Sequence, residues 1–153
     1  MWTAATQTHF CHPSNRFYPA LRRAGLIALV VDTDIGMTEE QRQSFGDTGI
    51  GISNLVGRAT VRASELSRDE LRAGADRLAA LVERIEPAVV AIAGVTAYRD
   101  AFADWKAGLG RQSHQLGPAA LWIVPNPSGL NAHETIESLA VWYREVAEAA
   151  GIT

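Results

Sequence analysis

The chain has little of what would tie it to a metal, a disulfide or a membrane. Cys11 is its single cysteine, which excludes an internal disulfide and any site built from several cysteines. Its four histidines are scattered and form no set of ligands with the spacing that a metal site needs. No apolar run approaches the ~20 residues of a membrane span, and residues 1–4 lack the pattern of a signal peptide. We therefore expect no metal, no cofactor and a cytoplasmic protein.

Positive charge is also scarce. The formal net charge of -3 argues against strong nonspecific affinity for DNA, because neutralising phosphates requires clustered Lys and Arg. A small footprint on DNA remains compatible with this charge, since a few cations can form a local basic face on an acidic body. The candidates for such a face are Arg16, Arg22, Arg23, Arg58, Arg62, Lys106 and Arg111. At 153 residues and 47% hydrophobic content, we expect one domain over residues 1–153 and a monomer.

Strand and helix patterns alternate along the chain. Residues 88–93 and 119–124 are continuous apolar runs, as expected of strands covered on both faces. Ser67 and Glu70 form a capping box that opens a helix extending to Pro87. This alternation predicts an α/β fold, a three-layer α/β/α sandwich with a mostly parallel central sheet.

The remaining elements are expected from caps, breakers and spacing. A helix begins near Ser14 or Asn15 and ends at Gly25, and a short helix begins at Thr38. The other expectations are a glycine-rich loop over 46–51, a short strand over 56–61, a helix over 96–106, a turn over 115–118 and a helix over 133–150.

The most informative segment is Val124-Pro125-Asn126-Pro127-Ser128-Gly129-Leu130-Asn131-Ala132. Its prolines and glycine prevent either strand or helix from continuing, so the loop should stand out from the sheet edge. It presents an amide, a hydroxyl and a large apolar side chain at the carboxyl end of a strand, where open α/β sheets bind ligands. An exposed leucine on such a loop suits a wedge pushed into a base stack.

Two further segments, Phe10-Cys11-His12-Pro13-Ser14-Asn15-Arg16-Phe17-Tyr18 and Gly49-Ile50-Gly51-Ile52-Ser53-Asn54-Leu55-Val56, give this loop a context. With these three motifs in this order, the chain resembles the mismatch-specific uracil/thymine DNA glycosylases of the uracil-DNA glycosylase superfamily. The resemblance covers almost the whole chain. It implies a DNA glycosylase fold, no metal and no lysine Schiff base.

One departure from the family pattern matters. Family members begin with an apolar strand that runs into a Gly-Ile-Asn-Pro-Gly-Leu type loop, whose Asn positions the attacking water, and this motif is not in the printed sequence. Either the start has been placed too late, or the chain is a natural truncation with weakened chemistry. Loss of a central strand would leave unpaired backbone groups, so we expect the first. An extended form should then be the active one.

The resemblance assigns roles that compete with ordinary structural ones. Phe10 is either the aromatic floor on which an extruded pyrimidine stacks or a core plug. Asn126 is either a donor to the departing base or an ordinary turn residue beside Pro. As a donor it would be neutral, whereas related families carry a His in this loop. Ser128 either holds a phosphate or caps the turn. Leu130 is either the wedge or a side chain folded back onto its own helix.

The other positions are weaker. Asn54 is either a turn former or a contact near the pocket, and Thr3 matches a small position that leaves room for a thymine methyl. Gly129 and Asn131 join Ser128 and Leu130 as expected DNA contacts. Asn131 and Ala132 differ from the Ser-Arg pair of the best-known members, which puts a contact to the opposite strand in doubt.

These observations lead to one functional hypothesis and two alternatives. The hypothesis is hydrolysis of the N-glycosidic bond of uracil, and of thymine or a modified cytosine, opposite guanine, after the base flips out of double-stranded DNA. The first alternative is a catalytically silent DNA- or nucleoside-binding relative. The second is a flavodoxin-like binder of small molecules, which the absence of a Gly-x-Gly-x-x-Gly signature disfavours.

Overall fold

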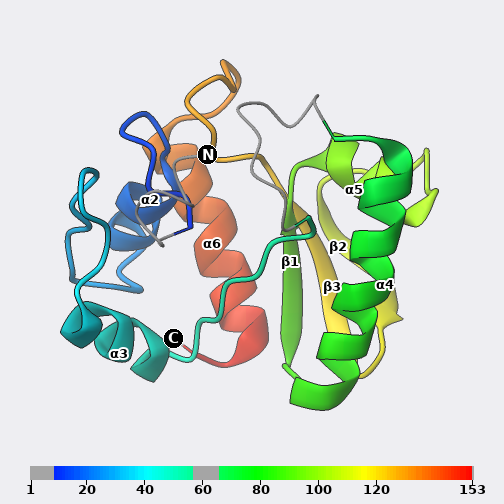
Figure 1. Cartoon of the computed structure of the whole chain (residues 1–153), viewed down its shortest axis with the longest axis horizontal. Coiled ribbons are helices and arrows are strands. Elements are labelled where there is room, and N and C mark those ends of the chain that lie inside the picture. The colour runs from blue at the N-terminus through cyan, green and yellow to red at the C-terminus, as the bar shows by residue number, and fades with distance from the viewer. Residues whose placement is uncertain (1–8, 57–65, 153) are drawn as a thin grey trace. The chain divides into compact units, whose positions relative to one another are not determined.

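The computed structural model describes residues 9–56 and 66–152, which form two compact units (Figure 1). The first unit comprises Met1–Ser53 and Pro127–Thr153, and the second comprises Asn54–Asn126. Thr3 and most of the strand predicted over 56–61 lie outside the described residues. No helix in the described part is both long enough and apolar enough to cross a membrane.

The first unit is helical. Its helices are α2 (Phe17–Arg23), α3 (Glu39–Asp47) and α6 (Ile136–Ala150). Helix α6 packs on α2, where the ring centroids of Phe17 and Tyr143 lie 5.7 Å apart (Figure 1). The buried residues of α6 recur at helical spacing and form one apolar stripe, made of Leu139, Ala140, Tyr143 and Ala147.

Local signals explain most ends of these helices. The exception is the start of α2, where Arg16 rather than the predicted Ser14 or Asn15 is the N-cap and makes no side-chain cap. Thr38 caps α3 with a capping box, as the sequence predicts. Helix α2 ends before Gly25, whose φ of 79° is readily adopted by glycine. Helix α6 begins at Ile136 rather than at the predicted His133. The reason is that the Thr135 side chain caps the helix, while the His133 N–H is taken by the Asn131 side chain at 3.1 Å.

The second unit is a small sheet with two helices on one of its faces (Figure 1). Strands β1 (Val89–Ala93), β2 (Gly110–Leu116) and β3 (Ala119–Val124) lie in the order β1-β3-β2. Helices α4 (Arg68–Ile85) and α5 (Val95–Phe102) pack on each other. The core of the unit gathers Ile92, Tyr98, Ala107, Leu121 and Ile123. The predicted α/β fold class is confirmed.

The arrangement of β1 and β3 positions the candidate site. The two strands are parallel, in a register that runs from Val89 opposite Ala120 to Ala93 opposite Val124. Strand β3 has the bounds that its apolar run predicts. Both strands therefore end at the same edge of the sheet, and the loop containing Asn126 leaves from that edge.

Strand β2 differs from the sequence-based expectation. It pairs with β3 in the antiparallel direction, so the described sheet is mixed, with one parallel and one antiparallel pair. The predicted turn over 115–118 reduces to Gly117 and Pro118, and Gly117 has the positive φ of 54° that a two-residue hairpin needs. The polar sequence of β2 gives no strand signal. Strand β2 is held by backbone pairing to β3, and its exposed face needs no apolar side chains.

Helix α5 is shorter than predicted. It ends at Phe102 rather than near Lys106, because Ala103 adopts the left-handed conformation with a φ of 54°. The chain that follows is fastened by Arg99, whose guanidinium donates two hydrogen bonds to the carbonyl of Ala107. This contact joins residues eight positions apart, which is not a helical spacing, so the pattern that predicts the helix does not reveal it.

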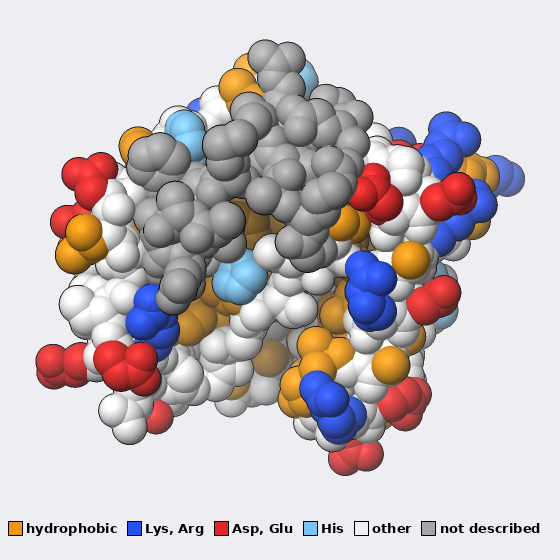
Figure 2. Space-filling view, viewed as in Figure 1, with side chains coloured by type: hydrophobic (Ala, Val, Ile, Leu, Met, Phe, Trp, Pro, Cys, Tyr) orange, Lys and Arg blue, Asp and Glu red, His pale blue; other side chains and the backbone are white. Residues whose placement is uncertain are grey.

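Helix α4 is amphipathic, with interspersed basic and acidic side chains over its exposed side (Figure 2). Its buried side includes Gly74, which lies directly against the chain at Leu55. A Cβ at position 74 would overlap the carbonyl oxygen of Leu55. This close approach explains a glycine in the middle of a helix, where it otherwise costs about 1 kcal/mol.

We expect Gly74→Ala to lower the free energy of unfolding by about 1–3 kcal/mol, because the added methyl group overpacks the contact with Leu55. Gly46→Ala in α3 is the matched control, since a Cβ there meets nothing within 4 Å. The control should be neutral or stabilising by up to ~1 kcal/mol. Urea denaturation of both variants measures the difference, and equal effects would show that Gly74 is not a packing requirement.

Candidate functional site

The loop between β3 and α6 begins where the two parallel strands end. The N–H of Gly94, just after β1, donates to the carbonyl of Val124 at 2.8 Å. Asn126 lies beside Gly94, since a Cβ on Gly94 would be 3.8 Å from both Cβ and Nδ2 of the asparagine. Asn126 is half-buried and is the last residue of the second unit. Its amide is thus placed at the sheet edge where the sequence predicts a donor.

The following segment, Pro127–Asn131, belongs to the first unit and lies against the loop before α2. The N–H of Arg16 donates to the carbonyl of buried Pro127 at 2.9 Å. Gly129 lies so close to Ser14 that an added Cβ would come within 2.5 Å of the serine Oγ. The structure therefore brings together two of the segments that the sequence singles out.

Leu130 is displayed by a turn with its own hydrogen bonds. The Leu130 N–H donates to Oγ of Ser128 at 3.2 Å, and the Asn131 N–H donates to the carbonyl of Ser128 at 3.0 Å. The Leu130 side chain is nevertheless 77% exposed. It is not folded back onto α6, so the alternative of a packing leucine does not describe this conformation.

The side chains of Ser128 and Asn131 both accept hydrogen bonds from the backbone of this loop. Ser128 accepts from Leu130, and Asn131 accepts from the His133 N–H at 3.1 Å. Both hydrogen bonds are those of ordinary turn-forming residues. The predicted DNA contacts of Ser128, Gly129, Leu130 and Asn131 stay predictions.

Phe10 lies just before the loop that contacts Pro127–Asn131. It is half-buried, has a φ of 57°, and its ring centroid is 4.3 Å from that of Phe17. Phe17 in turn contacts Tyr18 and Tyr143 at centroid distances of 5.0 and 5.7 Å. Phe10 is therefore part of an aromatic cluster. Its predicted stacking role stays a prediction.

A small cavity opens beside Phe10, lined also by Tyr18, Arg22, Val31 and Thr33. Its volume of about 80 Å³ has room for a few water molecules but is below the roughly 300–1,000 Å³ of a small-molecule pocket. Burial raises the pKa of Tyr18 far above its ordinary value, with a smaller contribution from Cys11. The Tyr18 hydroxyl therefore stays protonated at neutral pH.

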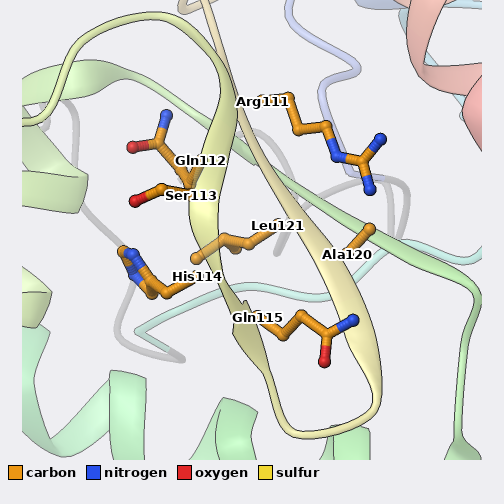
Figure 3. Close-up of a pocket in the computed structure, with 7 residues that line it drawn as sticks. All are labelled: Arg111, Gln112, Ser113, His114, Gln115, Ala120 and Leu121. Carbon is orange, nitrogen blue, oxygen red and sulfur yellow. The ribbon is translucent and has the colours of Figure 1, made fainter.

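A second, larger depression of about 570 Å³ lies on the β2–β3 hairpin (Figure 3). Arg111, Gln115 and Ala120 point to one side of the hairpin, whereas Gln112, Ser113 and His114 point to the other (Figure 3). His114 is also engaged by the hydroxyl of Tyr98 at 2.9 Å. These side chains do not converge on a common point, so we do not regard this depression as the functional site.

Two further predicted site residues, Asn54 and Thr3, are not among the contacts described above. Asn54 is exposed, in the second unit, in a segment without helix or strand, next to Leu55, whose carbonyl accepts from Arg77 at 3.1 Å. Thr3 lies outside the described residues. Among the described residues, no three His, Cys, Asp or Glu side chains gather in a way that could hold a metal ion.

Sequence reasoning missed Arg16 as a structural part of the site. Its Nη1 donates to the carbonyls of Ser128 at 3.2 Å and Asn131 at 2.8 Å. The sequence offers it only as one of several cations for a basic face. No local pattern could reveal its role, because its partners lie more than a hundred residues along the chain.

Comparison with known families adds an independent finding. The family described as the uracil DNA glycosylase superfamily matches residues 1–147, which is most of the chain. The match includes all three motifs on which the resemblance rests. It is at the level of the superfamily, whose members are DNA glycosylases, and the narrower mismatch-specific type stays a prediction. The chain therefore belongs to the uracil DNA glycosylase superfamily.

Proposed function

We propose that this protein hydrolyses the N-glycosidic bond of uracil mispaired with guanine in double-stranded DNA, and that the base flips out of the stack first. The observation that carries the proposal is the 77% exposed side chain of Leu130 on a turn fastened to the loop that follows Phe10. An apolar side chain held in water by a hydrogen-bonded turn is suited to insertion between bases. Thymine or a modified cytosine opposite guanine would be further substrates.

The partly exposed Phe10 ring would support the extruded base. Stacking of a base on an aromatic side chain is worth ~1–3 kcal/mol, which offsets part of the few kcal/mol that unstacking costs. The contact with Phe17 at 4.3 Å fixes the ring before the base arrives. A fixed ring loses little conformational entropy on binding, so more of the stacking energy is retained.

Asn126 is the proposed donor to the departing base. It stands at the carboxyl edge of β1 and β3, where open α/β sheets place their functional groups. The base leaves as an anion, and an amide donates a hydrogen bond to it without positive charge. Donors aimed at developing charge supply a large part of many enzymes' rate enhancement. A neutral donor therefore implies slower chemistry than a cationic one.

The test is single-turnover excision of uracil from a labelled G·U duplex, by this chain and by an upstream-extended form, compared with A·U and single-stranded substrates. Excision that is faster for G·U than for A·U supports the proposal. Tight binding to the duplex without excision would instead identify a catalytically silent DNA-binding relative. If the protein neither binds the duplex nor excises uracil, both of these interpretations are contradicted and a small-molecule binder is favoured.

We expect Leu130→Ala to slow excision from the G·U duplex on the order of 10-fold, because the gap left by the extruded base is no longer filled. Single-stranded uracil DNA has no gap to fill, so its excision should change much less. Leu109→Ala is the control, since Leu109 is another exposed leucine, at 44%. Equal losses on both substrates, without destabilisation, would place Leu130 in the base pocket instead of the stack.

Phe10 is tested by two substitutions that separate stacking from packing. We expect Phe10→Leu to weaken binding to a duplex with an extruded base analogue by ~1–3 kcal/mol, about 5- to 150-fold, because the π face is lost. Phe10→Tyr keeps the ring and should bind nearly normally. Both variants should melt within a few degrees of the parent. A Phe10→Leu variant that loses stability but keeps its affinity would show that Phe10 is only a core residue.

A further inference from the structure

The side chain of Arg16 binds the turn that displays Leu130 at a carbonyl before the leucine and at a carbonyl after it. Arg16 donates from Nη1 to the carbonyl of Ser128 at 3.2 Å and to that of Asn131 at 2.8 Å. Its own backbone N–H donates to the carbonyl of Pro127 at 2.9 Å. These three carbonyls span the segment from the residue after Asn126 to the residue after Leu130.

We propose that Arg16 is a positioning residue, which fixes the Leu130 turn in the conformation that enters DNA. This inference rests on the proposed function. It assigns to Arg16 a task distinct from phosphate binding, although an arginine beside a DNA-contacting loop would ordinarily be taken for a phosphate ligand. The guanidinium is instead directed at main-chain oxygens of this chain.

A cation suits this place for an electrostatic reason. Hydrogen bonds from a charged donor are about twice as strong as neutral ones, and both contacts are partly buried, where screening by water is reduced. Both hydrogen bonds leave one nitrogen, Nη1, whose two N–H groups have fixed directions in the guanidinium plane, whereas the lysine ammonium is a rotatable point charge on a flexible stem. Without Arg16, two carbonyls of the turn would lose a charged hydrogen-bond donor.

Arg16 is itself held in place. Asn15 accepts the N–H of Phe17 at 2.9 Å, which sets the chain just before α2. Ser14 and His12 are joined by a side-chain hydrogen bond of 2.9 Å, and Gly129 packs on Ser14. The loop after Phe10 and the Leu130 turn are thus one connected structure, so stacking on Phe10 and insertion of Leu130 would be geometrically linked.

The energetic benefit is preorganisation. Leu130 makes its proposed contact only in DNA, so any disorder of the turn would have to be lost on binding. An ordered turn avoids that cost. Arg16 would therefore affect duplex substrates, which need the wedge, and would leave single-stranded substrates nearly unaffected.

The matched control is Arg23→Ala. Arg23 carries the same charge, but its side chain is 64% exposed and its ion pair with Glu137 is long, at 4.0 Å. Such surface pairs contribute little to stability. The control removes one positive charge without touching the Leu130 turn.

The first measurement is hydrogen exchange of the Leu130 and Asn131 amides in the DNA-free protein. We expect Arg16→Ala to speed both at least about 10-fold, Arg16→Lys to have an intermediate effect, and Arg23→Ala to have none, while amides of α6 stay protected in all three. Unchanged exchange in Arg16→Ala overturns the proposal. If Arg16→Ala does not fold, the same comparison is made with Arg16→Lys, and unchanged exchange there overturns it.

The second measurement is a double-mutant cycle on excision from the G·U duplex. We expect Arg16→Ala to slow the duplex reaction about as much as Leu130→Ala, to spare single-stranded DNA, and to add nothing further in the Leu130→Ala background. Additive losses, or a salt dependence of duplex binding whose slope falls by about one, would make Arg16 a phosphate ligand and overturn the proposal.

The two measurements separate the possible failures. If neither this chain nor an upstream-extended form excises uracil from any substrate, the proposed function fails. The exchange experiment still decides whether Arg16 orders the turn, because it needs neither DNA nor catalysis.

Discussion

Backbone hydrogen bonding by the Pro127–Asn131 segment is the constraint on which the candidate site depends. A segment that leaves a sheet and is neither helix nor strand must find partners for its peptide groups elsewhere. Here the carbonyls of Pro127, Ser128 and Asn131 are satisfied by Arg16. Because these partners come from the chain itself, the turn can hold Leu130 in an exposed position without a hydrophobic contact to support it.

Elements with complete local signals were predictable from the sequence. The capping box at Ser67 and the apolar run before Pro125 fixed α4 and β3 closely, because caps and buried strands depend on neighbours in the chain. Strand β2 was not predictable, since its polar residues are held by pairing with β3. The premature end of α5 has the same origin, a contact between Arg99 and the Ala107 carbonyl that no helical pattern contains.

In the candidate site, too, some features were predictable from the sequence and others were not. Exposure of Leu130 followed from prolines and glycine that exclude regular structure, and the structure confirms that exposure. The packing of Phe10 on Phe17 was left open by the sequence, because an aromatic residue in a loop suits either a core or a surface. Arg16 escaped prediction altogether, since its donors meet carbonyls that become neighbours only after folding.

On the proposed function, discrimination between bases depends on extrusion more than on charge. A net charge of -3 provides little electrostatic attraction for nonspecific phosphate binding. The amide of Asn126 would assist departure of the base without a positive charge. Unstacking costs least for a mispaired base, and each 1.4 kcal/mol of that cost changes the extruded population tenfold. A wedge that acts only after the base has left stabilises every extruded base alike, so it raises the extruded population and leaves this difference intact. A slow chemical step then strengthens the selection, because a correctly paired base that flips out returns to the stack before its glycosidic bond breaks.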